Sequence, residues 1–322
     1  MKKVLILSAL LVACSLPAFA WQLNWTENFE LTTAGTTLAE QQGASWGAPW
    51  TNVDVGTNYA DTDLLVVNTN VDPSQPNHTV GGRQSAMQRP SAFSTNFMDM
   101  RSMTSTGTTG FQSGYARFWV YEPGTAGGNA QFQVGVMGDN EGGAVPPGTL
   151  DEPWPYQGSV TNAFIGATIR ETQAGGKNYW VAQWVGTFQT LDGTAGATAA
   201  SYKWIPLKPA PRRATAGWSY VKIDWGINLT LGSAYAEYRI NSATANMRLE
   251  YDSTAASGGN RWKATTPITS VYAGQTTSLV ADGRQGYVDD IEFHGNAIPE
   301  PTSLLALGTG LIGLIGLIRR KR

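Results

Sequence analysis

Cysteine, histidine and charged side chains are scarce in this chain of 322 residues, and each shortage excludes a class of site. Cys14 is the only cysteine, so the chain can form neither an intramolecular disulfide nor a zinc site built from several thiolates. The two histidines, His78 and His294, match no spaced metal motif such as H-E-x-x-H. No catalytic set of residues emerges, so we expect a protein that is not an enzyme.

The charge balance narrows the range of partners. Charged residues make up 14% of the chain, and its net charge is −2. The two ends hold six of the 22 Lys and Arg but one of the 24 Asp and Glu, so the part between them carries about −7. Such a domain is a poor partner for nucleic acid or an anionic membrane surface. A neutral glycan suits it better, and a count of 12 Trp supplies rings for sugar contacts.

The N-terminus has the three parts of a secretory signal peptide. A basic start precedes an uncharged run over residues 4–13, and the small residues Ala18 and Ala20 follow. The run is too short to span a membrane comfortably. We therefore expect a signal peptide over residues 1–20 that is removed on export, so that the mature chain begins at Trp21.

Cys14 leaves a second processing route open. Residues 11–14, Leu-Val-Ala-Cys, also resemble a lipobox, in which the cysteine is lipidated and becomes the N-terminus. Cleavage after Ala20 would leave a mature protein with no thiol and no lipid. Lipoprotein processing would instead keep Cys14.

The C-terminus predicts a single membrane-spanning helix. Residues 302–318 contain no charge, and as a helix they would reach about 25 Å, slightly under a typical hydrocarbon core. Four cations follow directly and would stay on the cytoplasmic side, which leaves the rest of the chain outside. These membrane-stop residues are Arg319, Arg320, Lys321 and Arg322.

The same end resembles a known sorting signal. Pro299, Glu300 and Pro301 precede the apolar segment and the basic terminus, and residues 298–322 match the PEP-CTERM signal of Gram-negative bacteria in order and spacing. The resemblance implies that an exosortase, an intramembrane cysteine protease, cuts near the triplet and passes the protein to the cell surface. It also implies a transient stay in the inner membrane and a host that makes exopolysaccharide.

The residues between the two ends predict one β-rich domain, 21–297. Alternating apolar and polar residues, bounded by Gly, Pro, Asn and Asp, recur along the chain, and helical periodicity is confined to the two termini. Many strands at this spacing indicate a sandwich or barrel. The expected strands fall within 114–121, 130–137, 162–170, 178–188, 218–225, 234–240, 245–251 and 286–293.

Four short motifs give the domain a further resemblance. Residues 28–30 (Asn-Phe-Glu), 81–85, 217–224 and 287–292 occur in the order seen in concanavalin-A-like (laminin-G-like) jelly rolls. The resemblance implies an all-β jelly-roll sandwich between the signal helix and the transmembrane helix.

The same resemblance suggests two kinds of site near the ends of the domain. Some glucanases of this topology carry Glu-x-Asp-x-Glu on a strand, but Val288 stands where the first Glu would be. Jelly rolls also often tie their first and last strands together with a structural Ca²⁺. Glu30, Asp289 and Asp290 are candidate ligands for it, and we expect no other cofactor.

Aromatic residues on polar strand faces are the main indication of a ligand. In residues 114–121 and 218–225, one face is aliphatic and the other mixes rings with charges such as Lys222 and Asp224. Rings can cover the apolar faces of sugars while the charged groups reach hydroxyls. The candidate ligand-binding residues are Tyr115, Arg117, Trp119, Trp180, Trp184, Trp218, Tyr220, Tyr235 and Glu237.

These observations predict an exported, surface-sorted, non-enzymatic protein that binds extracellular polysaccharide or is a structural part of it. Its expected partners are the exosortase and that polysaccharide, with no nucleic acid. An inert matrix role with no specific ligand is one alternative. A glycan-degrading enzyme of the glucanase or lyase kind is another, and two exposed carboxylates about 5–10 Å apart in an aromatic cleft would favour it.

Overall fold

All secondary structure that the computed structural model describes is β-strand, which confirms the all-β prediction. Within the described residues, no helix has the length and apolar character needed to cross a membrane. The signal peptide expected at 1–20 and the membrane helix expected at 302–318 lie outside that part of the chain. The described residues are 22–34, 38, 50–52, 64–69, 76–87, 97–103, 108–122, 132–138, 163–169, 179–186, 199–211, 213–228, 233–245, 247–252, 267–275 and 286–299.

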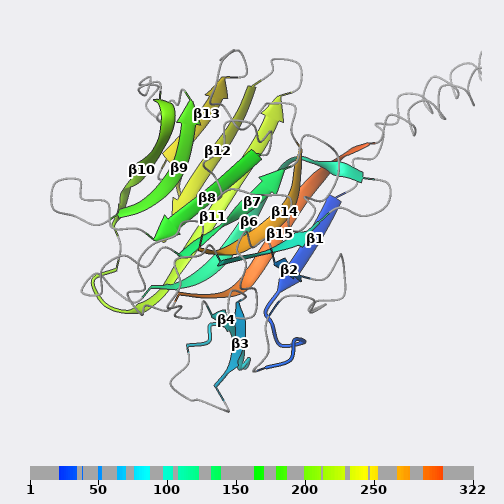
Figure 1. Ribbon diagram of the computed structural model, residues 1–322, viewed down its shortest axis with the longest axis vertical. Coiled ribbons are helices and arrows are strands. Elements are labelled where there is room, and N and C mark those ends of the chain that lie inside the picture. The colour runs from blue at the N-terminus through cyan, green and yellow to red at the C-terminus, as the bar shows by residue number, and fades with distance from the viewer. Residues whose placement is uncertain are drawn as a thin grey trace, which may run out of the picture.

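The strands pair antiparallel in two groups (Figure 1). One group has the order β10 (Ala199–Pro211), β9 (Tyr179–Gly186), β8 (Ala163–Ile169), β7 (Phe132–Gly138), β14 (Ile268–Gln275), β5 (Phe97–Ser102) and β2 (Trp50–Asn52). The other has the order β13 (Met247–Asp252), β12 (Ser233–Ile240), β11 (Gly217–Asn228), β6 (Thr108–Glu122), β15 (Tyr287–Pro299) and β1 (Gln22–Glu27).

A small hairpin extends the second group at one end. β4 (Gln84–Met87) pairs with the start of β15, and β3 (Leu65–Asn68) pairs with β4. In the described residues the two groups are joined where Ile268 of β14 pairs with Phe111 of β6. The last strand therefore lies between β1 and the long strand β6, so the two ends of the domain meet in one sheet.

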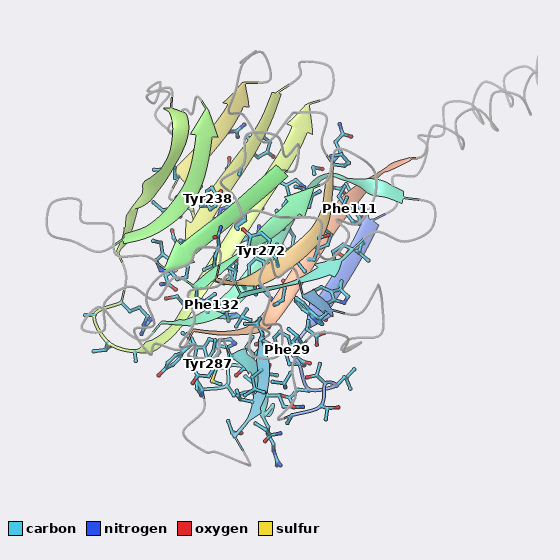
Figure 2. The ribbon with its side chains drawn as sticks, in the orientation of Figure 1. Phe29, Phe111, Phe132, Tyr238, Tyr272 and Tyr287 are labelled. Atoms are coloured by element: carbon cyan, nitrogen blue, oxygen red, sulfur yellow. The ribbon has the colours of Figure 1, made fainter. Side chains whose placement is uncertain are left out.

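Side chains from both groups of strands pack into one hydrophobic core. On β6, Phe118 and Val120 are fully buried, and Ile223 of β11 is buried beside them. Val134 and Val271 come from the other group and belong to the same cluster. The strands thus form the two layers of a β-sandwich. Figure 2 labels some of the large buried rings, among them Phe111, Phe132, Tyr238 and Tyr272.

Trp180 belongs to this core, which corrects one expectation. Its side chain on β9 is fully buried, so it is no part of an exposed binding surface. The sequence placed Trp180 with Trp184 on one face of a strand, but alternation alone does not say whether that face points inward. The side chain of Trp184 lies outside the described ones.

Each of the eight expected segments overlaps a strand, and the described residues form seven further strands that alternation did not single out. Two of these show why. β14 is buried at nearly every position, so it has no alternation to detect, and β4 is buried at all four of its positions. β15 is also longer than expected and runs to Pro299, two residues beyond the domain end placed at 297.

Candidate functional site

The polar faces of β6, β11 and β12 lie side by side in one sheet. Trp119 is directly opposite Tyr220, and Arg117 is opposite Lys222. Asp224 of β11 is in turn opposite Glu237 of β12. These side chains are half-buried, while the alternate residues of the same strands are in the core. The structure therefore brings together the rings and charges singled out in the sequence, on the side of the sheet away from the core.

Strands β15 and β13 widen this surface with residues that sequence reasoning did not propose. Glu292 lies opposite Arg117, and His294 lies opposite Tyr115. Arg248 lies opposite Glu237 at the other side. We call the whole surface the mixed face, and define it by Tyr115, Arg117, Trp119, Trp218, Tyr220, Lys222, Asp224, Tyr235, Glu237, Arg239, Arg248, Glu292 and His294.

Ion pairs link the charged side chains of the mixed face, both within a strand and between neighbouring strands. The Lys222 Nζ atom is 2.7 Å from Asp224 Oδ1, and Arg239 binds the other oxygen of Asp224. Arg239 also reaches Glu237, 3.2 Å away, and Arg248 lies 2.9 Å from the second oxygen of Glu237. The side chains of Asp224 and Glu237 are only 21% and 19% exposed, and Arg239 and Arg248 join them to the neighbouring strands.

Several rings of the mixed face lie against cations or other rings. Lys222 Nζ is 4.3 Å from the centre of the Tyr115 ring, and the Arg248 guanidinium is 4.0 Å from that of Tyr235. Tyr115 also stacks on His294, with ring centres 5.3 Å apart. Because these contacts fix ring orientation, the rings present defined planes.

A tighter group of rings lies at the end of the mixed face where β15 begins. We call it the aromatic corner, and define it by His78, Trp119, Trp218 and Tyr220. The His78 ring stacks on Trp119 at 3.8 Å and meets Trp218 edge-on at 5.5 Å. Trp119 meets Tyr220 edge-on at 5.6 Å. Burial is the main cause that raises the pKa of the Tyr220 hydroxyl above its ordinary value.

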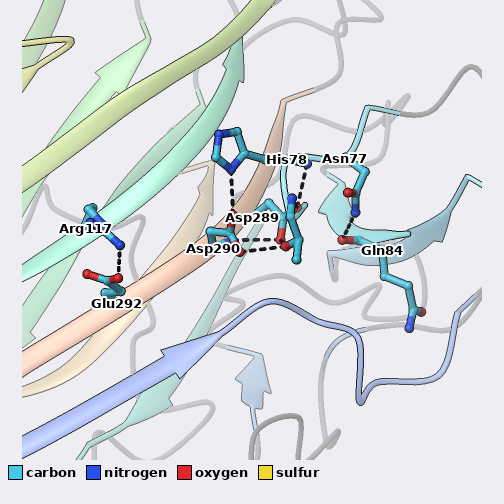
Figure 3. A network of polar contacts seen from close by, with 8 residues as sticks. Asn77, His78, Gln84, Arg117, Asp289, Asp290 and Glu292 are labelled. Carbon is cyan, nitrogen blue, oxygen red and sulfur yellow. Dashed lines mark hydrogen bonds and ion pairs between the residues drawn. The ribbon is translucent and has the colours of Figure 1, made fainter. Parts of the chain in front are cut away.

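His78 comes from the segment before β4 and is held by the last strand (Figure 3). Its Nδ1 atom is 2.7 Å from Asp290 Oδ2, and its backbone N–H donates to Asp289 at 2.9 Å. More than 200 residues separate His78 from these carboxylates, so no local pattern could have placed it beside Trp119.

Asp289 is the buried centre of this arrangement. Its carboxylate accepts hydrogen bonds from the backbone N–H groups of His78, Thr79 and Asp290. Burial raises the pKa of Asp289 to about 7, and the nearby Asp290 carboxylate adds to that rise, whereas these N–H donors lower it. Asp290 has a φ of 43°, in the left-handed region, at an irregularity in the β15–β6 register. That irregularity turns Asp290 toward His78 and Thr79.

Glu30 binds the other side of the loop over residues 78–83, which precedes β4. Its Oε1 atom accepts the backbone N–H groups of Arg83 at 2.5 Å and Gln84 at 2.7 Å. A Cβ atom added to Gly82 would lie 2.6 Å from that oxygen, which explains the need for glycine there. Glu30 and the Asp289–Asp290 pair therefore fasten two sides of one tight turn.

The carboxylates proposed for a calcium site make other contacts in this structure. Among the described residues, which include all three candidate ligands, no group of three carboxylate, histidine or cysteine side chains is placed to hold a metal ion. Glu30 and Asp289 accept backbone N–H groups. The calcium site of Glu30, Asp289 and Asp290 stays a prediction.

The sorting triplet begins where the last strand ends. Pro299 is the final residue of β15 and pairs with Thr108 of β6. The rest of the signal lies outside the described residues, as do the cleavage residues Ala18 and Ala20. The residues concerned at the C-terminus are Glu300, Pro301, Arg319, Arg320, Lys321 and Arg322.

Comparison with solved structures finds distant similarities. Peanut lectin is 10% identical, with 87% of this chain and 100% of that chain covered and a TM-score of 0.41. Lectin II from Ulex europaeus is 11% identical, with coverage of 77% and 98% and a TM-score of 0.38. An alginate lyase from Chlorella virus is 12% identical, with coverage of 73% and 93% and a TM-score of 0.44.

Comparison of sequences gives a more specific result. No curated protein matches the chain. The PEP-CTERM protein-sorting motif matches residues 297–322, which include Pro299, Glu300, Pro301 and the basic end. The C-terminus of this chain is therefore a PEP-CTERM sorting signal, and the protein is one that a Gram-negative bacterium exports and sorts at its membrane.

Proposed function

We propose that this protein is a surface-sorted, non-enzymatic protein whose mixed face binds extracellular polysaccharide. The observation that carries the proposal is the placement of Trp119, Trp218 and Tyr220 beside ion-paired charges on the side of the sheet away from the core. The sorting signal adds the location, because the match implies exosortase processing and release toward the cell surface.

The chemistry of the mixed face suits sugars. Indole and phenol rings can cover the apolar C–H face of a pyranose, and the aromatic corner offers such rings at two inclinations, 18° and 69° to His78. Arg117, Lys222 and Glu237 are half-buried and can exchange hydrogen bonds with hydroxyl groups. Each hydrogen bond to a sugar hydroxyl replaces one to water, so its net contribution to the binding free energy is small. Binding should therefore be weak at one site and stronger on a repeating polymer.

One feature favours the alternative, a glycan-degrading enzyme. Asp224 and Glu237 are cross-strand neighbours whose carboxylates share Arg239, so two carboxylates lie close together, as the catalytic pair of a glycosidase does. Against it, Arg239 bridges both carboxylates, and Lys222 and Arg248 occupy their other oxygens. Each of the two carboxylates therefore has two cationic partners, and all four of their oxygens face a cation in place of a glycosidic oxygen.

A glycan array probed with the purified domain, residues 21–299, tests the proposal. We expect selective binding to polysaccharides or long oligosaccharides, with no change in their chain length after prolonged incubation. Shortened or unsaturated products would instead support the enzyme. Absence of binding to every polymer, including the host's own exopolysaccharide, would support the inert matrix role.

A further inference from the structure

The sorting signal of this protein begins inside the folded sheet. The motif match starts at Ala297, and β15 continues through Pro299. Ala297 is 5% exposed and pairs with Phe111, and Pro299 pairs with Thr108. Only Glu300 separates this strand from Pro301, so no linker lies between the domain and the triplet.

The same three residues have fewer described strand partners than the rest of β15. Among the described residues, β1 pairs with β15 as far as the Gln22–Asn296 pair, and residues 297–299 pair with β6. Their register is irregular between Asn296 and Ala297 and again between Ala297 and Pro299. Pro299 also has no N–H group to donate to the sheet. A strand end of this kind opens at low free-energy cost while the rest of the sheet stays folded.

We propose that residues 297–299 leave β6 before the sorting protease acts, so that the end of β15 is a substrate segment stored in the sheet. The inference rests on the exosortase processing proposed above. A protease that binds an extended segment needs the backbone N–H and C=O groups that a neighbouring strand would otherwise occupy. Because no linker precedes the triplet, the residues next to the cleavage site belong to β15. The protease can bind only those of them that have separated from β6.

A disulfide within this segment tests the proposal in the producing host. Phe111 and Ala297 are cross-strand partners, and antiparallel partners have the Cα separation a disulfide needs. Cys14 is the only native cysteine and lies in the expected signal peptide, so mispairing is limited. We expect Phe111→Cys with Ala297→Cys to slow processing about tenfold or more and to accumulate full-length precursor, because the cross-link holds the segment on β6.

Three controls separate this effect from simple damage. Each single substitution should be processed no more slowly than the wild type, because neither can form the cross-link. A disulfide between positions 233 and 252, cross-strand partners on β12 and β13, should leave processing unchanged. Insertion of eight Gly and Ser residues between Ala297 and Ile298 should restore processing of the pinned protein, because it supplies unpaired chain.

The outcomes are distinct. Processing of the fully oxidised pinned protein at the wild-type rate would overturn the inference, as would failure of the insertion to rescue it. If the wild-type protein itself is never cut, the exosortase part of the proposed function fails first, and polysaccharide binding is unaffected by that result.

Discussion

The imidazole of His78 lies nearly parallel to the indole of Trp119, with ring centres 3.8 Å apart. His78 is brought there from before β4 by Asp289 and Asp290 of β15, so the loop and the last strand together shape the aromatic corner. One ring face of Trp119 is therefore covered by another side chain of the protein. A sugar would meet a composite surface of His78, Trp218 and Tyr220 as well as Trp119 itself.

Asp289 should make stability depend on pH. Its folded-state pKa of about 7 lies above the ordinary 3.8, so folding favours the protonated form. The stability that this group contributes is complete below about pH 3.8 and is lost progressively as pH rises to about 7. We expect this loss to lower the urea midpoint between about pH 4 and pH 7, and Asp289→Asn to remove it.

Asp290→Asn is the matched control for this measurement. Burial, and not the neighbouring carboxylate, is the main cause of the raised pKa, so this variant should keep most of the pH dependence. An Asp289→Asn protein whose midpoint changes with pH as much as the wild type's would contradict the assignment.

Glu30 should stabilise the protein without a metal. Because its carboxylate accepts two backbone N–H groups, Glu30→Gln should lower the free energy of unfolding by about 1–3 kcal/mol. The melting temperature of the wild type should be the same in millimolar Ca²⁺ and in EDTA. A rise of several degrees with Ca²⁺ that Glu30→Gln abolishes would support the calcium site.

Arg239 should couple β11 to β12 through its two carboxylate partners. Removing its charge in Arg239→Met leaves Asp224 and Glu237 facing each other with one fewer cation between them. We expect a loss of about 1 kcal/mol, smaller in high salt because screening weakens such pairs. A loss that does not change with salt would mean that Arg239 stabilises the sheet by packing alone.

The sequence predicted which strand residues form the mixed face, but not the residues that distant segments of the chain contribute to it. Alternation was enough for Trp119, which stands between the apolar Phe118 and Val120, and for Tyr220, which is followed by Val221, because these neighbours face the core. The same reasoning misplaced Trp180, since a tryptophan on a short strand fits either face. His78 could not be found at all, because its place depends on a β15 irregularity more than 200 residues away.

Both ends of the mature protein should differ from the gene product. We expect surface-extracted protein to begin at Trp21 and to lack residues 302–322, since the signal peptide and the anchor are removed in sorting. Intact mass together with N-terminal sequencing measures both ends. An acylated Cys14 would show the lipoprotein route, and peptides containing Arg319 to Arg322 would contradict removal of the anchor.

The affinity of Trp119→Ala for the host's polysaccharide tests the central claim most directly. Affinity electrophoresis through gels containing that polymer should show binding weakened about tenfold, with Leu31→Ala, a change at a side chain 71% exposed and outside the mixed face, binding like the wild type. The melting temperature of Trp119→Ala should fall by only a few degrees, because the ring is half-buried and belongs to neither layer's core. Unchanged affinity in Trp119→Ala, or a collapse of its stability like that expected for a core tryptophan, would contradict a polysaccharide-binding mixed face.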